Sequence, residues 1–424
     1  MKIAIVINSL EGGGAERVAC TLATHLRRAR HEVLIVTLHG GNIAYELPAD
    51  VRVRHLRSRR FMHGWQRLAL LPLAAAELAA VLAREKPDAT ISFLTRSNLA
   101  HVLTRFYGNR RAIYISERVD AEAEYVGQKR LLGAMVRRLY ARADHIVAIS
   151  EGVRQSLGRM AIPLARITTV HNPHDLAAIR AAAASAPPRP ESRRPFRVVM
   201  AGRLTRQKGY PTMLDVLSIL VNERKLEVQL VVLGDGPDRA ALAAQAEQLG
   251  VWDCIEWVGW VKNIHAMMGS CDAFAFTSLY EGFGNALVEA MACGLPVVST
   301  DCPSGPAEIL DGGRYGFLVP VGDALAIANA LASLMNDDAL RASYAQRARE
   351  GAARFDVSAV AARYLAVMGV PAHSAEAEVD PRAEPQRERG RTVNVAQALH
   401  PERAAHRVGQ PAALEAEHDG GGHR

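Results

Sequence analysis

The sequence GRLTRQKG, residues 202–209, directly follows the apolar run RVVMA at residues 197–201, which predicts a buried strand. Two of its cations, Arg203 and Lys208, lie five residues apart just beyond that strand. Guanidinium and ammonium groups bind phosphate, and ligands of parallel α/β sheets lie at the carboxyl ends of the strands. The stretch therefore predicts an α/β fold with an anion site, and the alternative is a pair of solvated loop cations.

A second stretch, EGFGNALVE at residues 281–289, places two carboxylates eight residues apart. Gly282 and Gly284 indicate that Glu281 lies in a loop, while Glu289 falls on the helix that follows. Carboxylates accept hydrogen bonds from sugar hydroxyls, so a site with both cations and carboxylates suits a nucleotide sugar. The alternative for Glu289 is a solvent-exposed position on that helix.

Apolar runs alternate with amphipathic stretches along the whole chain, which is typical of parallel sheets covered by helices. We expect strands at 2–8, 32–38, 51–56, 89–93, 111–116, 145–149, 167–171, 198–201, 228–233, 255–258, 273–277, 297–300 and 317–319. We expect helices at 15–28, 65–84, 98–107, 129–142, 151–160, 211–222, 239–249, 264–268, 285–293, 324–336, 339–355 and 357–368. This pattern predicts two Rossmann-like, doubly wound domains that face each other across a ligand-binding cleft.

Composition shifts divide the chain. Four prolines between residues 187 and 195 predict a linker at 181–196, after a first domain at 1–180. A second domain is expected at 197–355 and a closing helix at 356–370. Residues 371–424 lack an apolar period, which predicts a disordered tail.

Charge and cysteine content limit the possible classes of protein. The five cysteines form no Cys-x-x-Cys pair, so a zinc site or disulfide framework is not expected. The apolar stretch at residues 68–83 is shorter than the roughly 20 residues that span a bilayer. Residues 1–180 hold 27 basic and 15 acidic residues, an excess of +12, which indicates an anionic membrane face or nucleic acid as a partner; the alternative is a solvated arginine-rich surface.

A glycine-rich segment, GGGAER at residues 12–17, follows the first strand and opens the first helix. Gly13 and Gly14 would let a phosphate or sugar approach the helix N-terminus closely. Arg17 replaces the third glycine of the dinucleotide fingerprint, which argues against NAD. The alternative is a tight turn that binds no ligand.

Together with GDGP at residues 234–237, these motifs resemble the retaining family-4 glycosyltransferases of the GT-B fold, over about residues 1–368. The resemblance implies that Arg203 and Lys208 bind the donor diphosphate and, with Glu281 at the donor sugar, form the catalytic set. It also implies ribose binding by Glu289. The remaining donor-binding candidates are Gly13, Gly14, Val261 near the base, and the backbone at Phe283, Gly284 and Asn285.

Two further segments, SER at residues 116–118 and DCPSGPAEIL at 301–310, are similar to bacterial enzymes that extend lipid-linked oligosaccharides for exopolysaccharide or glycan synthesis. Such enzymes often transfer galactose or N-acetylgalactosamine. The resemblance implies a UDP-sugar donor, a polyprenyl-diphosphate-linked acceptor, and a cytoplasmic, peripheral location on the inner face of the membrane. Many family members place a histidine where Ser116 to Arg118 stand, so Arg17, Glu117 and Arg118 become our acceptor-binding candidates.

Charge also predicts the mechanism. Arg203, Lys208 and helix N-termini would stabilise a departing diphosphate. No Asp-x-Asp motif stands between a strand and a loop, so these cations would replace a divalent ion, and we expect no metal and no cofactor. Retention of configuration is what the resemblance implies. The leaving phosphate oxygen would then serve as the base for the acceptor hydroxyl.

Two other functions compete with this prediction. A UDP-sugar 2-epimerase would use a similar two-domain fold without an acceptor. A basic nucleic-acid-binding protein is the more distant alternative, but aromatic residues make up only 5% of the chain and no nucleic-acid-binding module is found. We therefore expect no nucleic acid among its partners.

Overall fold

A computed structural model describes residues 1–39, 41–57, 69–125, 130–186 and 195–371. All of them belong to one compact unit. The predicted tail, except Pro371, and residues 187–194 of the predicted linker lie outside the described residues. Among the residues described, no helix is long and apolar enough to cross a membrane.

The first lobe is built on a parallel sheet with the strand order β3-β2-β1-β4-β5-β6-β7. Its strands read as nearly continuous apolar runs because helices cover both faces. The strands are β1 (Lys2–Ile7), β2 (Glu32–Thr37), β3 (Arg52–His55), β4 (Ala89–Phe93), β5 (Tyr114–Glu117), β6 (His145–Ala148) and β7 (Ile167–Thr169).

Side chains alternate between the two faces of β1. Ala4 and Val6 pack with α3, α4, α6 and α7, whereas Ile3 and Ile5 pack with α1 and α16. The helices of this part of the chain are α1 (Gly14–Arg28), α3 (Leu71–Glu85), α4 (Thr95–Leu103), η2 (Thr104–Tyr107), α5 (Ala121–Glu124), α6 (Arg130–Tyr140), α7 (Glu151–Arg159) and η4 (Leu164–Arg166).

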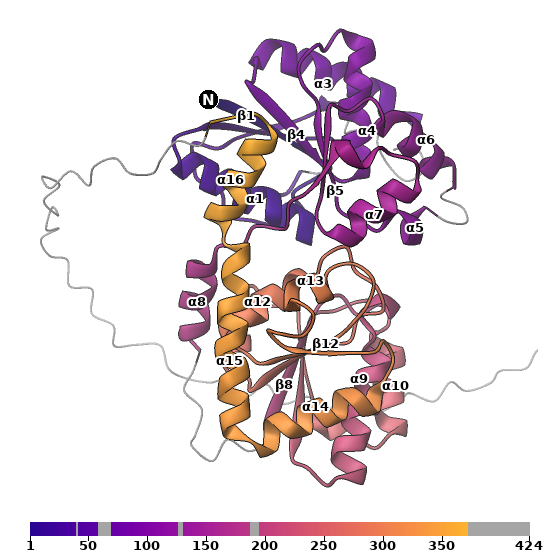
Figure 1. The fold of residues 1–424 in the computed structure, drawn as a ribbon, viewed down its shortest axis with the longest axis vertical. Coiled ribbons are helices and arrows are strands. Elements are labelled where there is room, and N and C mark those ends of the chain that lie inside the picture. Colours follow the sequence, from indigo (N-terminus) through magenta and orange to yellow (C-terminus); the bar gives the residue numbers. More distant parts are fainter. Residues whose placement is uncertain (40, 58–68, 126–129, 187–194, 372–424) are drawn as a thin grey trace, which may run out of the picture. The chain divides into compact units, whose positions relative to one another are not determined.

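The second lobe repeats this design with the strand order β10-β9-β8-β11-β12-β13, again with parallel pairs throughout (Figure 1). Apolar residues on both faces of the sheet are buried. The strands are β8 (Phe196–Ala201), β9 (Val228–Leu233), β10 (Ile255–Gly259), β11 (Ala273–Phe276), β12 (Val297–Thr300) and β13 (Phe317–Val319).

Helices α9, α10 and α14 cover one face of this sheet, and α11, α12 and α15 lie on the other. The helices are α8 (Leu176–Ala184), η5 (Arg206–Lys208), α9 (Tyr210–Ser218), η6 (Ile219–Glu223), α10 (Arg239–Gln248), η7 (Trp252–Cys254), α11 (Ile264–Gly269), α12 (Asn285–Cys293), α13 (Pro306–Leu310), α14 (Ala324–Asn336), α15 (Asp338–Ala352), η8 (Ala353–Phe355) and α16 (Val357–Val367).

The last helix, α16, returns to the first lobe and packs beside α1 (Figure 1). Its Val360 and Tyr364 are fully buried in the same cluster as Ile5 and Phe93. Residues near 360 are therefore buried against the first sheet, whose strands all lie between residues 2 and 169.

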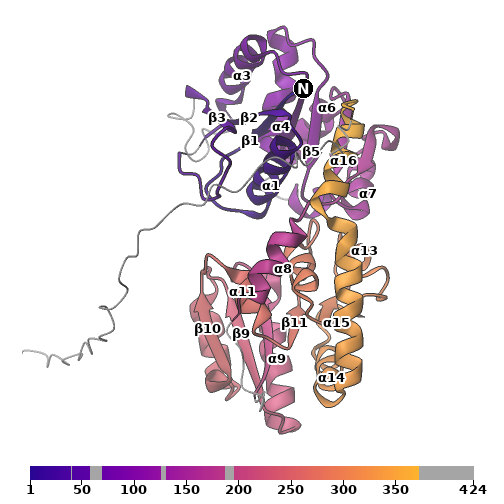
Figure 2. The same ribbon diagram turned by 90° about the vertical axis from the view of Figure 1, so that its left-hand side faces the viewer.

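The predicted α/β class is confirmed, and most strands fall within a few residues of their expected bounds. Helix α8 was not predicted, and it packs against α11 and α12 of the second lobe (Figure 2). The expected boundary at residue 180 falls inside this helix. The predicted division into domains otherwise stays a prediction.

Candidate functional site

The loop after β8 brings the cationic stretch to the end of β11. It forms the short helix η5 and then turns at Gly209, whose φ of +64° lies in the left-handed region. A Cβ at Gly209 would lie 2.9 Å from the carbonyl carbon of Thr277, so only glycine lets the two backbones come this close. The turn fixes Lys208 beside the loop that follows β11.

Lys208 and Glu281 form an ion pair in the structure. The Nζ of Lys208 donates to Oε1 of Glu281 at 2.5 Å, and the Ser278 hydroxyl donates to the same oxygen at 2.7 Å. The Glu281 side chain is 8% exposed and that of Lys208 is 22% exposed. A lysine and a carboxylate that were predicted to serve the same ligand are thus in direct contact.

Arg203 lies in the same loop but is exposed. Within the described ranges, no hydrogen bond or ion pair engages its guanidinium. The structure therefore does not bring Arg203 into contact with Lys208 or Glu281. Its five donors are available to a ligand at the carboxyl edge of the second sheet.

Glu289 lies on α12, which glycines bound at both ends. Gly284 and Gly294 have φ values of +114° and +83°, and residues 287–292 between them are all buried. The Glu289 side chain is only 4% exposed, so the alternative of a solvated helix position is wrong.

Two cationic or potentially cationic groups face the Glu289 carboxylate. Arg17 of α1 donates to its Oε1 at 2.9 Å, and His265 Nε2 lies 3.5 Å from its Oε2. Burial alone would raise the pKa of Glu289, but His265 and the charge of Arg17 hold it at about 2. At 3.5 Å the histidine contact is at the outer limit of a hydrogen bond. Glu289 is therefore an anion at neutral pH.

The glycine-rich loop lies against the start of α12. The Tyr45 hydroxyl accepts from the Gly13 N–H at 2.8 Å and donates to the Gly13 carbonyl oxygen at 2.7 Å. A Cβ at Gly14 would lie 3.1 Å from Nδ2 of Asn285. Two donor-site candidates from distant parts of the chain are therefore neighbours.

Arg118 reaches the same region through a chain of side-chain contacts. It donates to Oδ1 of Asn172, and Asn172 Nδ2 donates to Oδ1 of Asn285 at 2.7 Å. Arg118 is 7% exposed and lies over the Phe93 ring at 5.3 Å. Burial lowers the pKa of its guanidinium. Arg118 thus supports Asn285 from inside the first lobe.

The position of Glu117 corrects our prediction that it binds an acceptor. This side chain is fully buried, and it accepts from the Tyr140 hydroxyl at 2.5 Å and from the Arg118 backbone N–H at 2.8 Å. Burial raises the pKa of Glu117. No accessible surface is left for a ligand, so we assign Glu117 to holding the end of β5.

Two further candidates contribute through backbone or packing. The Phe283 ring is buried and stacks on His171, with ring centroids 5.4 Å apart. Val261 is half-buried against apolar neighbours, whereas the preceding Trp260 is 80% exposed. The Phe283 backbone leads into α12. The donor-binding roles of Phe283 and Val261 stay predictions.

Among the residues that contact these candidates, sequence reasoning missed Tyr45, Asn172, His265 and Ser278, as well as Tyr140 beside Glu117 and His171 beside Phe283. Ser278 lies three residues before Glu281, so its contact is local. The partners of Gly13, Asn285 and Glu289 come from distant segments, and residue spacing carries no signal for such contacts.

Cavities and acidic clusters add little to this site. A cavity of about 190 Å³ shares Arg17 with it and is also lined by Thr21, Tyr45 and Glu46. A larger one, of about 750 Å³, lies near Asp272 and Arg341. Where the structure describes the chain, no group of three or more His, Cys, Asp or Glu side chains is placed to hold a metal.

Two family models match the chain. Residues 13–173 match the glycosyl transferase 4-like domain, and residues 185–351 match the glycosyl transferases group 1. The first match covers the first lobe from the glycine-rich loop to β7, without β1, and the second covers the whole second sheet.

Similar proteins act on polysaccharides and lipid-linked glycans. The N-acetylgalactosamine-N,N'-diacetylbacillosaminyl-diphospho-undecaprenol 4-alpha-N-acetylgalactosaminyltransferase of Campylobacter jejuni is 28% identical over 362 residues, which cover 84% of this chain and 96% of that protein. The amylovoran biosynthesis glycosyltransferase AmsD of Erwinia amylovora is 26% identical, over 84% and 95% of the two chains. The crystal structure of HepE from Anabaena with UDP and glucose superimposes with a TM-score of 0.72, at 21% identity, over 87% of this chain and 99% of that one.

Proposed function

The chain belongs to the group 1 and 4-like glycosyl transferases and has the GT-B fold, and from this membership we propose a specific reaction. The enzyme moves a hexose or an N-acetylhexosamine from a UDP-sugar, with retention of configuration, to a polyprenyl-diphosphate-linked oligosaccharide. The product serves the synthesis of a surface polysaccharide or glycan.

One observation carries the proposal: Lys208, Glu281 and the buried anion Glu289 all lie beyond the carboxyl ends of second-lobe strands, with Arg203 exposed nearby. Lys208 and Arg203 suit a diphosphate, and the two carboxylates suit the hydroxyls of a sugar and a ribose. The UDP in the HepE structure supports a uridine donor.

The Lys208–Glu281 pair suggests how the donor binds. A diphosphate next to Lys208 would share its ammonium group, and Glu281 could then accept from the sugar hydroxyls. In the transfer step, the bond between the anomeric carbon and the phosphate oxygen breaks, and a bond to the acceptor oxygen forms. The acceptor proton passes to the departing UDP, whose negative charge Arg203 and Lys208 stabilise. We propose that neither a metal nor a cofactor takes part.

The acceptor is proposed from the relatives. The C. jejuni transferase is named for a diphospho-undecaprenol substrate, and AmsD for amylovoran biosynthesis. Because Arg17 contacts Glu289, we now place Arg17 at the nucleoside end of the donor and no longer at the acceptor.

A lipid-linked acceptor would bring the enzyme to a membrane, and we propose a peripheral location on its cytoplasmic face. The helix α6 fits such a surface, since Leu131 is 69% exposed and Arg130, Arg137 and Arg138 are exposed around it. Cationic helices with apolar side chains bind anionic bilayers in this manner.

A donor screen tests the proposal. Purified protein is incubated with a series of UDP-sugars, with and without a polyprenyl-diphosphate-linked glycan, and released UDP is measured. We expect UDP release that depends on both substrates. Conversion of a UDP-sugar into its 2-epimer without an acceptor would support the epimerase instead.

A further inference from the structure

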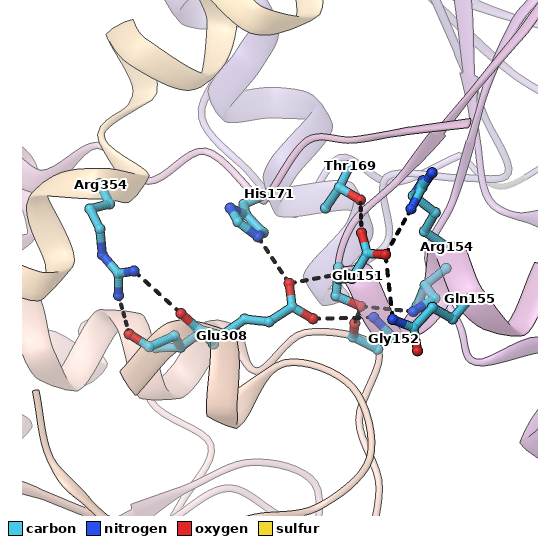
Figure 3. A network of polar contacts seen from close by, with 12 residues as sticks. Glu151, Gly152, Arg154, Gln155, Thr169, His171, Glu308 and Arg354 are labelled. Atoms are coloured by element: carbon cyan, nitrogen blue, oxygen red, sulfur yellow. Dashed lines mark hydrogen bonds and ion pairs between the residues drawn. The ribbon is translucent and has the colours of Figure 1, made fainter. Parts of the chain in front are cut away.

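The segment DCPSGPAEIL, residues 301–310, joins the two lobes in the structure. It contains the turn after β12 and the short helix α13, and Glu308 on that helix faces the start of α7 in the first lobe (Figure 3). No role was assigned to Glu308 from the sequence, so its contacts need an explanation.

Glu308 caps a helix of the other lobe. Its Oε2 accepts from the Glu151 backbone N–H at 2.9 Å, and its Oε1 accepts from the Gly152 backbone N–H at 3.2 Å. These are among the first N–H groups of α7, which have no partner inside that helix. A carboxylate at a helix N-terminus is also favoured by the helix dipole. Glu308 of the second lobe thus supplies the hydrogen-bond acceptor that a residue next to the helix normally provides.

Further groups fix this carboxylate and its helix. His171 Nε2 lies 3.2 Å from Oε2 of Glu308, and Arg354 donates to the carbonyl oxygens of Glu308 and Ile309 (Figure 3). Burial alone would raise the pKa of Glu308, but hydrogen bonds from His171 and from the α7 backbone hold it below its usual value. Glu308 is therefore ionised at neutral pH, and its two oxygens accept from identified donors.

The same turn and the same end of α7 enclose the loop that carries Glu281. The Glu281 N–H donates to the Pro303 carbonyl at 3.1 Å, and the Ser150 hydroxyl donates to the Gly282 carbonyl at 2.8 Å. Ser150 is also the N-cap of α7, where its side chain accepts from the Val153 N–H. One side of the Glu281 loop is thus held by the segment that carries Glu308, and the other by the helix that Glu308 caps.

We infer that Glu308 is a positioning residue, which clasps α7 to α13 and thereby sets the place of the Glu281 loop for transfer. The inference rests on the proposed function and extends it to a residue that touches no substrate. Arg203, Lys208 and Glu289, the residues proposed to bind the UDP part of the donor, lie outside the clasp, so UDP binding should not depend on it.

Replacing Glu308 with Ala tests the clasp. We expect kcat to fall about tenfold to a hundredfold, because small misplacements of reacting groups have effects of this size. UDP affinity should stay close to that of the wild type. The amides of Glu151 and Gly152 should exchange hydrogen faster, and Glu308→Gln, which keeps one acceptor oxygen, should lose less activity than Glu308→Ala.

Replacing Gly152 with Ala tests the same contact between α7 and Glu308 by changing the residue on the α7 side. A Cβ at this position would lie 2.9 Å from Cα of Ser304, so it would push α7 and the turn apart, while alanine favours the helix itself. We expect the same loss of kcat with UDP binding retained. Glu247→Ala, which removes an exposed carboxylate on α10, is the matched control and should leave kcat unchanged.

Wild-type turnover in both Glu308→Ala and Gly152→Ala would overturn the inference, as would an equal loss of kcat and of UDP affinity. Failure of the proposed function has a different signature, since the wild-type protein would then release no UDP from any UDP-sugar. Hydrogen exchange at α7 reports on the clasp in either case.

Discussion

At the scale of single residues, the candidate site is defined by two carboxylates that have different partners. Glu281 is paired with a lysine of its own lobe, whereas Glu289 is paired with an arginine 272 residues away in the sequence. Residue spacing predicted both carboxylates, because their positions relative to the glycines reveal the loop and the helix. It could not predict Arg17 as the partner of Glu289, since that contact depends on how two separate segments fold.

Glu281→Ala should abolish transfer while the fold is retained, because the change removes the proposed contact to the reacting sugar. Turnover with donor and acceptor is measured together with the melting temperature. Glu247→Ala is the control for loss of an exposed carboxylate. Near-wild-type turnover in Glu281→Ala would remove Glu281 from the catalytic set.

Lys208→Ala and Arg203→Ala should each lower kcat about a hundredfold or more, since each cation is proposed to stabilise charge on the leaving diphosphate. Arg206→Ala is a matched control, because this exposed arginine lies in the same loop. The assays are repeated with EDTA. Loss of activity in EDTA, with little effect of the two substitutions, would show that a metal does this work.

At the scale of elements, sequence pattern identified the helices with clear ends. Glycines in the left-handed region bound α12, and its predicted range, Asn285–Cys293, matches the structure. Helix α8 was missed because its alanine-rich sequence has little apolar periodicity and precedes the proline-rich segment. The prediction that Glu117 binds an acceptor was wrong because a polar residue at a strand end can also point into the core. Only the fold shows the tyrosine hydroxyls that donate hydrogen bonds to it.

The ion pair between Arg17 of α1 and Glu289 of α12 predicts that the free energy of unfolding depends on pH in the acid range. The pKa of Glu289 is about 2 in the folded protein and near 4.5 in the unfolded chain. Its ionised form therefore stabilises the fold above about pH 4.5, and this contribution is lost as the pH falls towards 2.

Arg17→Ala should raise the pKa of Glu289 and make stability less dependent on pH between 4.5 and 2. We expect the free energy of unfolding at pH 7 to fall by about 1 kcal/mol, since Arg17 is 44% exposed and solvent screens the pair. Urea unfolding at several pH values measures both effects. Arg28→Ala, on the same helix, is the control, and an equal effect of both changes would contradict this role of Arg17.

At the scale of the whole molecule, the basic excess of residues 1–180 lies in the part of the chain that forms the first sheet. The fold class could be predicted because alternating apolar and amphipathic runs specify parallel sheets with little ambiguity. That α16 returns to the first lobe could not be predicted from the sequence. An apolar helix face can pack into either core, and only the fold shows which one it enters.

This charge distribution predicts membrane binding that depends on lipid charge. The protein should sediment with vesicles that contain anionic lipid and much less with neutral ones. Each basic residue near the surface contributes roughly 1 kcal/mol, which salt screens. Replacing Arg57, Arg59 and Arg60 with Glu should weaken sedimentation but not the use of a soluble acceptor analogue; Arg59 and Arg60 lie outside the described residues. Sedimentation that does not depend on lipid charge or on salt concentration would contradict the prediction.

The central claim is retaining transfer from a UDP-sugar to a lipid-linked acceptor, and product analysis tests it most directly. The glycan made from a UDP-α-sugar and a polyprenyl-diphosphate-linked acceptor is examined by NMR, and released UDP is measured in the same reaction. We predict one α-linked sugar for each UDP released, and no product with Glu281→Ala. A β-linked product, or no transfer from any UDP-sugar, would contradict the account.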